Sequence, residues 1–202
     1  MTDAIVAIRN AVKPFLAQLE AGDNVLVAVS GGADSLALAA AVLKESQEFA
    51  ITPIAVTVDH QLQSGSGEQA EKVENQLKEM GYGKVISKKV VVTTESGLEA
   101  GARDARYQAL SSCASQEKAT KVFLGHTRDD QAETVLLGLA RGSGTRSLSG
   151  MASENGIYIR PLLNITRDQT VAAPRDSISA MRSSSCETSC SSGPGAIAVL
   201  SL

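Results

Sequence analysis

A short apolar segment that runs straight into a glycine turn constrains this chain more than any other feature. Residues 25–29 read Val-Leu-Val-Ala-Val, and Ser-Gly-Gly-Ala-Asp-Ser follows at Ser30–Ser35, before an alanine- and leucine-rich stretch. The order predicts a buried strand, a tight turn and a helix. The two glycines let the backbone approach a ligand, and amide N–H groups and two hydroxyls then converge on one place. An anion there also faces the positive end of the helix that begins at about Asp34.

The turn predicts phosphate binding without matching the commonest nucleotide motifs. The chain contains neither G-x-x-x-x-G-K-[ST] nor G-x-G-x-x-G, so an ordinary P-loop or Rossmann site loses support. The turn by itself also allows a second interpretation, namely a strand-to-helix connection that needs glycine only for its geometry.

Length and composition predict one globular domain of ordinary size. The chain has 202 residues, of which 43% are hydrophobic and 20% charged, as in water-soluble proteins. Its apolar runs are shorter than the roughly 18 residues that span a membrane, and its start lacks a signal-peptide pattern. We therefore expect a cytoplasmic protein without a membrane segment. The net charge of −3 gives no basic footprint for nucleic acid.

Three cysteines are too few and too unevenly placed for a disulfide framework. They are Cys113, Cys186 and Cys190. The pair at 186 and 190 lacks a second pair or nearby histidines, so it indicates a metal only weakly.

Strand-like and helical segments alternate along the chain. We expect strands at Asn24–Val29, Ile51–Val58, Lys84–Val91, Lys121–Gly125 and Ile157–Arg160. We expect helices at Asp3–Leu19, where Pro14 introduces a kink, and at Asp34–Ser46, Gly67–Met80, Leu98–Ala114 and Asp129–Ala140. The alternation predicts an α/β fold with a parallel sheet of about five strands and helices on both faces. Right-handed crossovers bring the loops after the strands to one edge, where ligands bind.

The last 32 residues, 171–202, differ from the rest. They hold nine serines and no aromatic residue, and they lack helix or strand periodicity until an apolar end. We predict a folded domain at 1–170 and an irregular serine-rich tail at 171–202.

Two of the expected loops carry basic side chains. His60 leaves the second strand after Asp59, where it serves either as a ligand contact or as a structural histidine. Arg103 and Arg106 lie three residues apart on one helix face, an arrangement that suits phosphate or carboxylate. Glu99 lies four residues before Arg103, so the simpler interpretation is an ion pair between these two side chains on a solvent-exposed helix face.

The loop after the fourth strand gathers acids. His126 precedes Asp129, Asp130 and Glu133, and Arg141 follows the next helical stretch. The helix dipole alone favours acids in a first turn. It does not explain three carboxylates beside the predicted phosphate loop, because a cation is needed to relieve their mutual repulsion. A magnesium ion or a substrate ammonium group would supply that charge.

These motifs resemble a known family. Ser30–Ser35 resembles the S-G-G-x-D-S loop of the N-type ATP pyrophosphatases, or PP-loop enzymes. The further motifs are similar to those of the bacterial tRNA(Ile)-lysidine synthetase family. They are Val58-Asp59-His60, Gly101–Tyr107, Gly125–Thr134, Arg141–Gly144 and Arg160–Leu163. The resemblance covers about Val25 to Asp168 and implies the PP-loop ATPase fold, of the adenine nucleotide alpha hydrolase type.

The resemblance implies a carbon–nitrogen ligase that works in two steps. ATP activates the C2 carbonyl oxygen of the wobble cytidine in a tRNA(Ile) with a CAU anticodon, and pyrophosphate leaves. The ε-amine of L-lysine then displaces AMP and forms lysidine. ATP, Mg²⁺ and a homodimer are implied with it.

The resemblance also implies a role for each candidate residue. Nucleotide contacts fall to Ser30, Gly31, Gly32, Ala33, Asp34, Ser35 and His60. Asp34, Asp130 and Glu133 are the implied catalytic acids: Asp34 and Asp130 hold magnesium, and Asp130 with Glu133 orients the lysine amine and helps it lose a proton. Arg103, Arg106, His126, Asp129 and Arg141 contact phosphate or substrate.

One departure and two alternatives remain. Family members continue with an Asp-x-x-Asn and arginine-rich segment, whereas the resemblance here stops near 169–171, so we hypothesise a substituted or out-of-frame ending that weakens tRNA binding and activity. One alternative is another PP-loop enzyme that thiolates tRNA or forms an amide, although no cysteine lies near the loop. The other is an ATP-binding domain without turnover.

Overall fold

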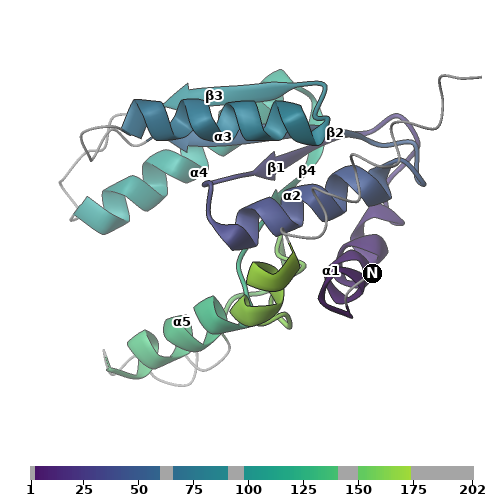
Figure 1. The fold of residues 1–202 in the computed structure, drawn as a ribbon. Coiled ribbons are helices and arrows are strands. Elements are labelled where there is room, and N and C mark those ends of the chain that lie inside the picture. The colour runs from purple at the N-terminus through teal and green to yellow at the C-terminus, as the bar shows by residue number, and fades with distance from the viewer. Residues whose placement is uncertain (1–2, 60–65, 91–97, 141–149, 174–202) are drawn as a thin grey trace, which may run out of the picture.

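The computed structural model describes residues 3–59, 66–90, 98–140 and 150–173 (Figure 1). Its helices are α1 (Asp3–Leu16), α2 (Ala33–Ser46), α3 (Ser66–Met80), α4 (Leu98–Gln116) and α5 (Arg128–Ala140). Its strands are β1 (Asn24–Ala28), β2 (Thr52–Asp59), β3 (Val85–Lys89), β4 (Ala119–Leu124), β5 (Glu154–Asn155) and β6 (Tyr158–Ile159). Each expected strand and helix is present, with ends shifted by a few residues.

The strands form one sheet in the order β3-β2-β1-β4-β6-β5. Every pairing is parallel except that of β5 with β6. This confirms the expected α/β fold and corrects the strand number from about five to six. The crossover between β1 and β4 brings the ends of these two strands together at the centre of the sheet.

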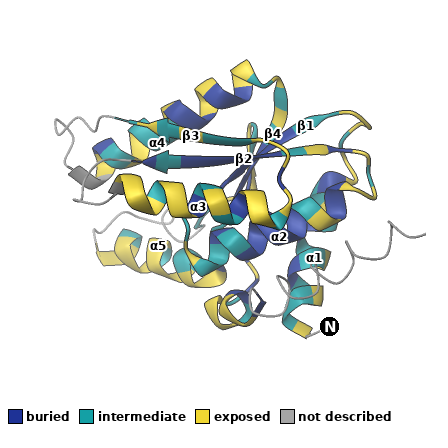
Figure 2. Cartoon of the chain, turned by 45° about the horizontal axis from the view of Figure 1, so that its top comes forward, coloured by how far each residue is buried: buried dark blue, intermediate teal, exposed yellow. Residues whose placement is uncertain are grey.

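The centre of the sheet is buried on both faces, since β1 contributes side chains to two cores. Val25, Val27 and Val29 pack in the cluster that holds α1, α2 and α3, whereas Leu26 and Ala28 pack in the cluster that holds α4. A strand covered on both sides is expected to read as a continuous apolar run. Residues 25–29, which lead into the glycine turn, are at most 4% exposed, and the neighbouring β2 is largely buried as well (Figure 2).

Helix α1 is tied to α2 by a buried acid. Glu45 of α2 is 1% exposed and forms ion pairs with Arg9 and Lys13 of α1. The Lys13 Nζ lies 3.2 Å from Glu45 Oε2. Pro14 lies inside α1, which ends two residues later at Leu16 rather than at the expected Leu19.

The chain stays regular past residue 170. Residues 167–173 are helical, three residues beyond the expected boundary, so the start of the expected irregular tail is ordered. The rest of that tail, with Cys186 and Cys190, lies outside the described residues. None of the helices in the described ranges has the length and apolarity that crossing a membrane requires.

Candidate functional site

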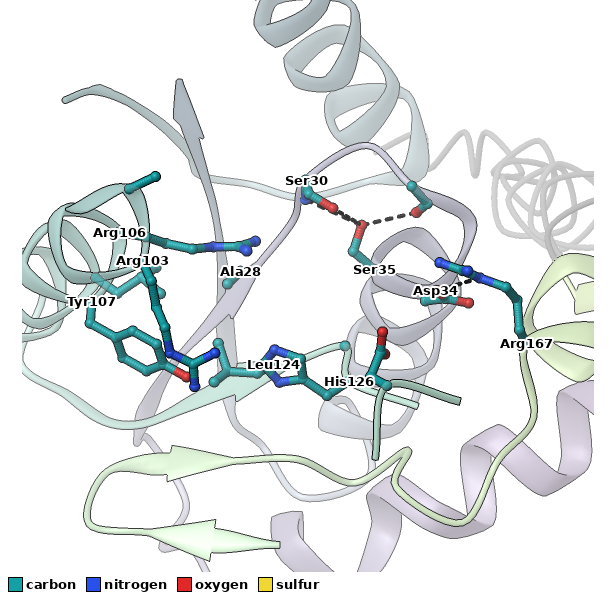
Figure 3. A pocket seen from close by; sticks show the side chains of 15 residues that line it. Ala28, Ser30, Asp34, Ser35, Arg103, Arg106, Tyr107, Leu124, His126 and Arg167 are labelled. Carbon is teal, nitrogen blue, oxygen red and sulfur yellow. Dashed lines mark hydrogen bonds and ion pairs between the residues drawn. The ribbon is translucent and has the colours of Figure 1, made fainter. Parts of the chain in front are cut away.

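A pocket of about 400 Å³ lies at the carboxyl ends of β1 and β4 (Figure 3). Its walls come from the glycine turn, α4, the turn after β4, and Arg167. The expected site residues that line it are Ser30, Gly32, Asp34, Ser35, Arg103, Arg106, His126 and Asp130. The fold thus brings together side chains from three separate motifs.

The glycine turn is closed on itself by hydrogen bonds. The Ser30 amide donates to Ser35 Oγ at 3.2 Å, and Ser35 Oγ donates to the Gly32 carbonyl at 2.9 Å. Gly31 has a φ of +87°, and a Cβ there would lie 2.6 Å from Val73 Cγ2. Glycine is therefore required at this position by both backbone conformation and space.

The turn leaves the start of α2 open. Gly32 occupies the N-cap position of α2, where no side chain makes a capping hydrogen bond. Gly125, which follows β4, approaches this helix start closely, since a Cβ on it would lie 3.0 Å from the Ser35 Cα. Uncapped first-turn amides at the positive end of a helix form an anion site.

Two arginines from α4 line the same pocket, and Arg106 points toward Ser30 (Figure 3). Arg103 is exposed, and its guanidinium carbon lies 5.4 Å from the centre of the Tyr107 ring. Burial lowers the pKa of Arg106, yet a guanidinium remains charged at neutral pH. Both arginines therefore bring positive charge to the pocket.

Tyr107 is held by an aromatic and guanidinium network that sequence reasoning left without a role. Its ring packs edge-on against Tyr158 at 4.9 Å, and Arg160 Nη2 donates to its hydroxyl at 3.2 Å. Arg160 is buried, and its Nη1 also donates to the Ala152 carbonyl. The Arg-Pro-Leu-Leu motif at 160–163 could have indicated this network, because it places the Arg160 cation directly after an apolar strand.

His126 is uncharged at neutral pH. Burial, followed by the positive charge of Arg160, lowers its pKa to about 4. Its Nδ1 is buried and has no hydrogen-bond partner among the described residues. A neutral imidazole with an unsatisfied ring nitrogen beside a pocket is placed to meet a ligand group.

The three acids of α5 differ in their surroundings. Asp130 lines the pocket, and its Oδ2 accepts hydrogen bonds from the Thr127 amide at 2.7 Å and the Thr127 hydroxyl at 3.0 Å, which caps α5. Asp129 accepts from the Arg167 amide at 2.8 Å, and Glu133 is exposed. Neither Asp129 nor Glu133 lines the pocket.

Asp34 is engaged by residues that the sequence did not point to. Its Oδ1 accepts from the Thr170 hydroxyl, and its Oδ2 lies 3.5 Å from Arg167 Nε. Thr166 and Gln169 form a T-x-x-Q capping pair that would have predicted the helix at 167–173, though not its contact with Asp34.

A magnesium ion fits this donor set. The described residues contain no group of three histidine, cysteine or acid side chains suited to a metal. Asp34 and Asp130 both line the pocket, and one or two carboxylates with substrate phosphates are the usual magnesium ligands. His60 and Arg141 lie outside the described residues.

The model of the PP-loop domain matches residues 4–179. The chain belongs to the PP-loop family. This agrees with the serine and glycine turn at the start of α2, the segment that first resembled the family.

Curated relatives of this PP-loop chain are tRNA(Ile)-lysidine synthases. The one from Thermobifida fusca is 51% identical over 163 residues, covering 81% of this chain and 50% of its own length. The one from Streptomyces coelicolor is 56% identical over 146 residues, covering 71% of this chain and 42% of its own length. The chain thus spans about half the length of the curated relatives it matches.

A solved structure shares the fold. It is a U34-tRNA thiolase, NcsA from Methanococcus maripaludis with its [4Fe-4S] cluster, with a TM-score of 0.67 over 93% of this chain and 68% of its own. The sequence identity of 20% limits this likeness to the fold.

Proposed function

We propose that this chain is the ATP-using part of a tRNA(Ile)-lysidine synthase, which joins L-lysine to C2 of the wobble cytidine and releases AMP and pyrophosphate. The observation that carries the proposal is the meeting, in one pocket, of the open start of α2 with Arg106, His126 and Asp130. Relatives with that name, at 51% and 56% identity, support the same reading.

The nucleotide half of the reaction rests on the turn at Ser30–Ser35. Its uncapped amides and its hydroxyls bind the phosphates of ATP. As the cytidine C2 oxygen attacks the α-phosphorus, the α–β phosphoanhydride bond breaks and negative charge builds on pyrophosphate. Preorganised donors stabilise that charge without reorganising. Arg103 and Arg106 add positive charge from α4.

Asp34 and Asp130 would hold Mg²⁺ in this proposal. When bound, the ion would neutralise the negative charge of the phosphates. The carboxylates of the chain supply the negative charge that keeps it at the pocket.

The amine half of the reaction rests on the first turns of α5. Asp130 and Glu133 are three residues apart on one helix, so their carboxylates can share one ammonium group. They orient the lysine side chain and accept a proton from it, which frees the nitrogen lone pair. That nitrogen attacks C2, the bond from C2 to the adenylate oxygen breaks, and AMP leaves. A cytoplasmic location and a homodimer belong to the same proposal.

Lysine transfer to RNA tests the proposal. The protein is incubated with labelled lysine, ATP, Mg²⁺ and a tRNA(Ile) transcript that carries the CAU anticodon. We expect label in RNA and equal amounts of AMP and pyrophosphate. A transcript with a UAU anticodon is the matched control and should take no label.

Two results would contradict this assignment. Pyrophosphate release that is independent of this tRNA would indicate another PP-loop reaction. Nucleotide binding without any turnover would indicate an ATP-binding domain that does not catalyse the reaction alone.

A further inference from the structure

The helix at residues 167–173 reaches back to the start of α2. Its Thr170, which is fully buried, donates a hydroxyl hydrogen bond to Asp34 Oδ1, and Arg167 Nε lies 3.5 Å from Asp34 Oδ2. The Asp34 side chain is 15% exposed and that of Arg167 is 64% exposed. The phosphate turn therefore has a cationic neighbour that comes from outside the motifs of the family resemblance.

The backbone of Arg167 is fixed by α5. Its amide donates to Asp129 Oδ2 at 2.8 Å, and the Arg128 amide donates to the Ile165 carbonyl at 2.9 Å. Thr166 and Gln169 cap the helix reciprocally. The position of Arg167 beside the pocket is thus set, while its exposed side chain keeps rotational freedom.

The contact between Arg167 and Asp34 is weak. It joins a single pair of atoms at 3.5 Å, without the two parallel hydrogen bonds of a strong arginine–carboxylate pair. Such a partly exposed pair contributes little to stability. A cation that binds Asp34 would compete with the guanidinium for the same carboxylate.

Thr170 can release Asp34 without losing its hydrogen bond. Its hydroxyl has a second acceptor, the Arg167 carbonyl, at 2.7 Å. One hydroxyl carries one proton and can point to either acceptor. Asp34 is therefore held by two contacts that can both be given up at small cost.

Arg167 faces the serine turn from the side opposite the α4 arginines. In Figure 3, Ser30 and Ser35 lie between Arg106 on one side and Arg167 on the other. A chain of phosphates bound at the turn would have guanidinium groups at both ends. Arginine suits this role because its planar fork matches phosphate oxygens.

We propose that Arg167 binds the polyphosphate of the nucleotide, and that it exchanges Asp34 for phosphate when Asp34 takes up Mg²⁺. This inference rests on the proposed use of ATP. It assigns to Arg167 a ligand contact and to Thr170 a positioning role. It predicts that the pocket binds magnesium-bound ATP more tightly than the free nucleotide.

Calorimetric binding of a non-hydrolysable ATP analogue and of AMP tests the phosphate contact. Arg167→Ala should weaken analogue binding in Mg²⁺ by about tenfold or more and leave AMP binding unchanged, because AMP lacks the β- and γ-phosphates. Arg128→Ala, which removes an exposed arginine outside the pocket lining, is the matched control and should leave both affinities unchanged. Circular dichroism checks that each variant is folded.

The outcomes separate this inference from the proposed function. Failure of the unaltered protein to bind either nucleotide contradicts the proposed function. Binding that Arg167→Ala leaves intact, or that falls equally for the analogue and AMP, overturns the phosphate contact alone.

A double-mutant cycle tests the exchange. In EDTA, Asp34→Asn should strengthen analogue binding because it frees Arg167, and adding Arg167→Ala should remove most of that gain. If Asp34→Asn raises the affinity equally with Arg167 present and with Arg167→Ala, the gain comes only from the lost carboxylate charge. That result would overturn the exchange.

Discussion

Helices α2 and α5 begin at the same sheet edge, after neighbouring strands, and yet they are built in opposite ways. Helix α2 starts at Gly32 without a side-chain cap and buries nine of its residues, including Leu38. Helix α5 starts with Thr127 and Asp130 in a capping pair and has no buried residue. Figure 2 shows the contrast in exposure along the two helices.

The difference assigns opposite charges to the two ends of the pocket. An open helix start offers amide protons and positive potential, which suits phosphate. A start that is already capped by a carboxylate offers negative charge, which suits an ammonium group or a metal ion. We therefore expect damage to α2 to affect nucleotide binding and folding, and damage to α5 to affect lysine transfer.

The largest expected effect concerns Glu133 on α5. Glu133→Ala should lower the rate of lysine transfer by about 100-fold or more, the usual contribution of a proton acceptor, and change nucleotide affinity less than about twofold. Single-turnover transfer and calorimetry measure the two quantities. Glu71→Ala, an exposed acid on α3, is the control. Equal loss of ATP affinity would mean that Glu133 serves metal or fold.

The next effect compares the burial of the two helices. Leu38→Ala on α2, where the side chain is 0% exposed, should lower the free energy of unfolding by about 2–5 kcal/mol. Leu136→Ala on α5, where the side chain is 65% exposed, should change it by less than about 0.5 kcal/mol. Urea denaturation measures both. A large loss from Leu136→Ala would show that α5 is covered in solution.

A smaller effect concerns the turn into α2. Gly31→Ala should destabilise the protein by roughly 1–3 kcal/mol, from the left-handed φ and the Val73 contact, and weaken nucleotide binding. Gly22 has a φ of +93° with nothing within 4 Å of a built Cβ. Gly22→Ala therefore measures the cost of the left-handed φ without a steric contact. We expect unchanged nucleotide affinity in that control. Equal effects of the two variants would rule out a special role for the turn.

The last effect depends on pH and concerns His126, in the turn into α5. Its pKa of about 4 in the folded protein lies below the ordinary value of 6.5. Between pH 6.5 and about 4, this histidine is protonated in the unfolded chain and neutral in the folded protein. The free energy of unfolding should therefore fall as pH drops from 6.5 to 4, by at most about 1.4 kcal/mol per pH unit. His126→Gln should reduce this slope in pH-dependent denaturation; an unchanged slope would contradict the pKa.

The sequence was sufficient for the parts of the site that local pattern encodes. An apolar run followed by two glycines predicts β1 and its turn, because burial and backbone conformation are local properties. In the structure, Ser35, Arg106 and Asp130 line one pocket. The two-residue strand Glu154–Asn155 was missed because it is short, polar and exposed.

Contacts between distant segments could not be predicted in this way. Asp130 accepts from the nearby Thr127, a contact that its sequence spacing allows, whereas Asp129 accepts from the Arg167 amide, 38 residues later. Thr170 meets Asp34 across 136 residues. Pairings of this length depend on how the last helix packs, which no periodicity in the chain records.

The most direct test of the account is to close the open start of α2. Gly32 has a φ of −74°, and a built Cβ would lie 3.7 Å from Ser30 Oγ, so a side chain fits there. Gly32→Asp should cap α2, keep or raise stability by a few tenths of a kcal/mol, and reduce affinity for the ATP analogue by about tenfold or more, because the new carboxylate occupies the phosphate site. Calorimetry that finds the analogue bound as tightly as before, in a protein that is equally stable, would contradict the assignment of this helix start to phosphate.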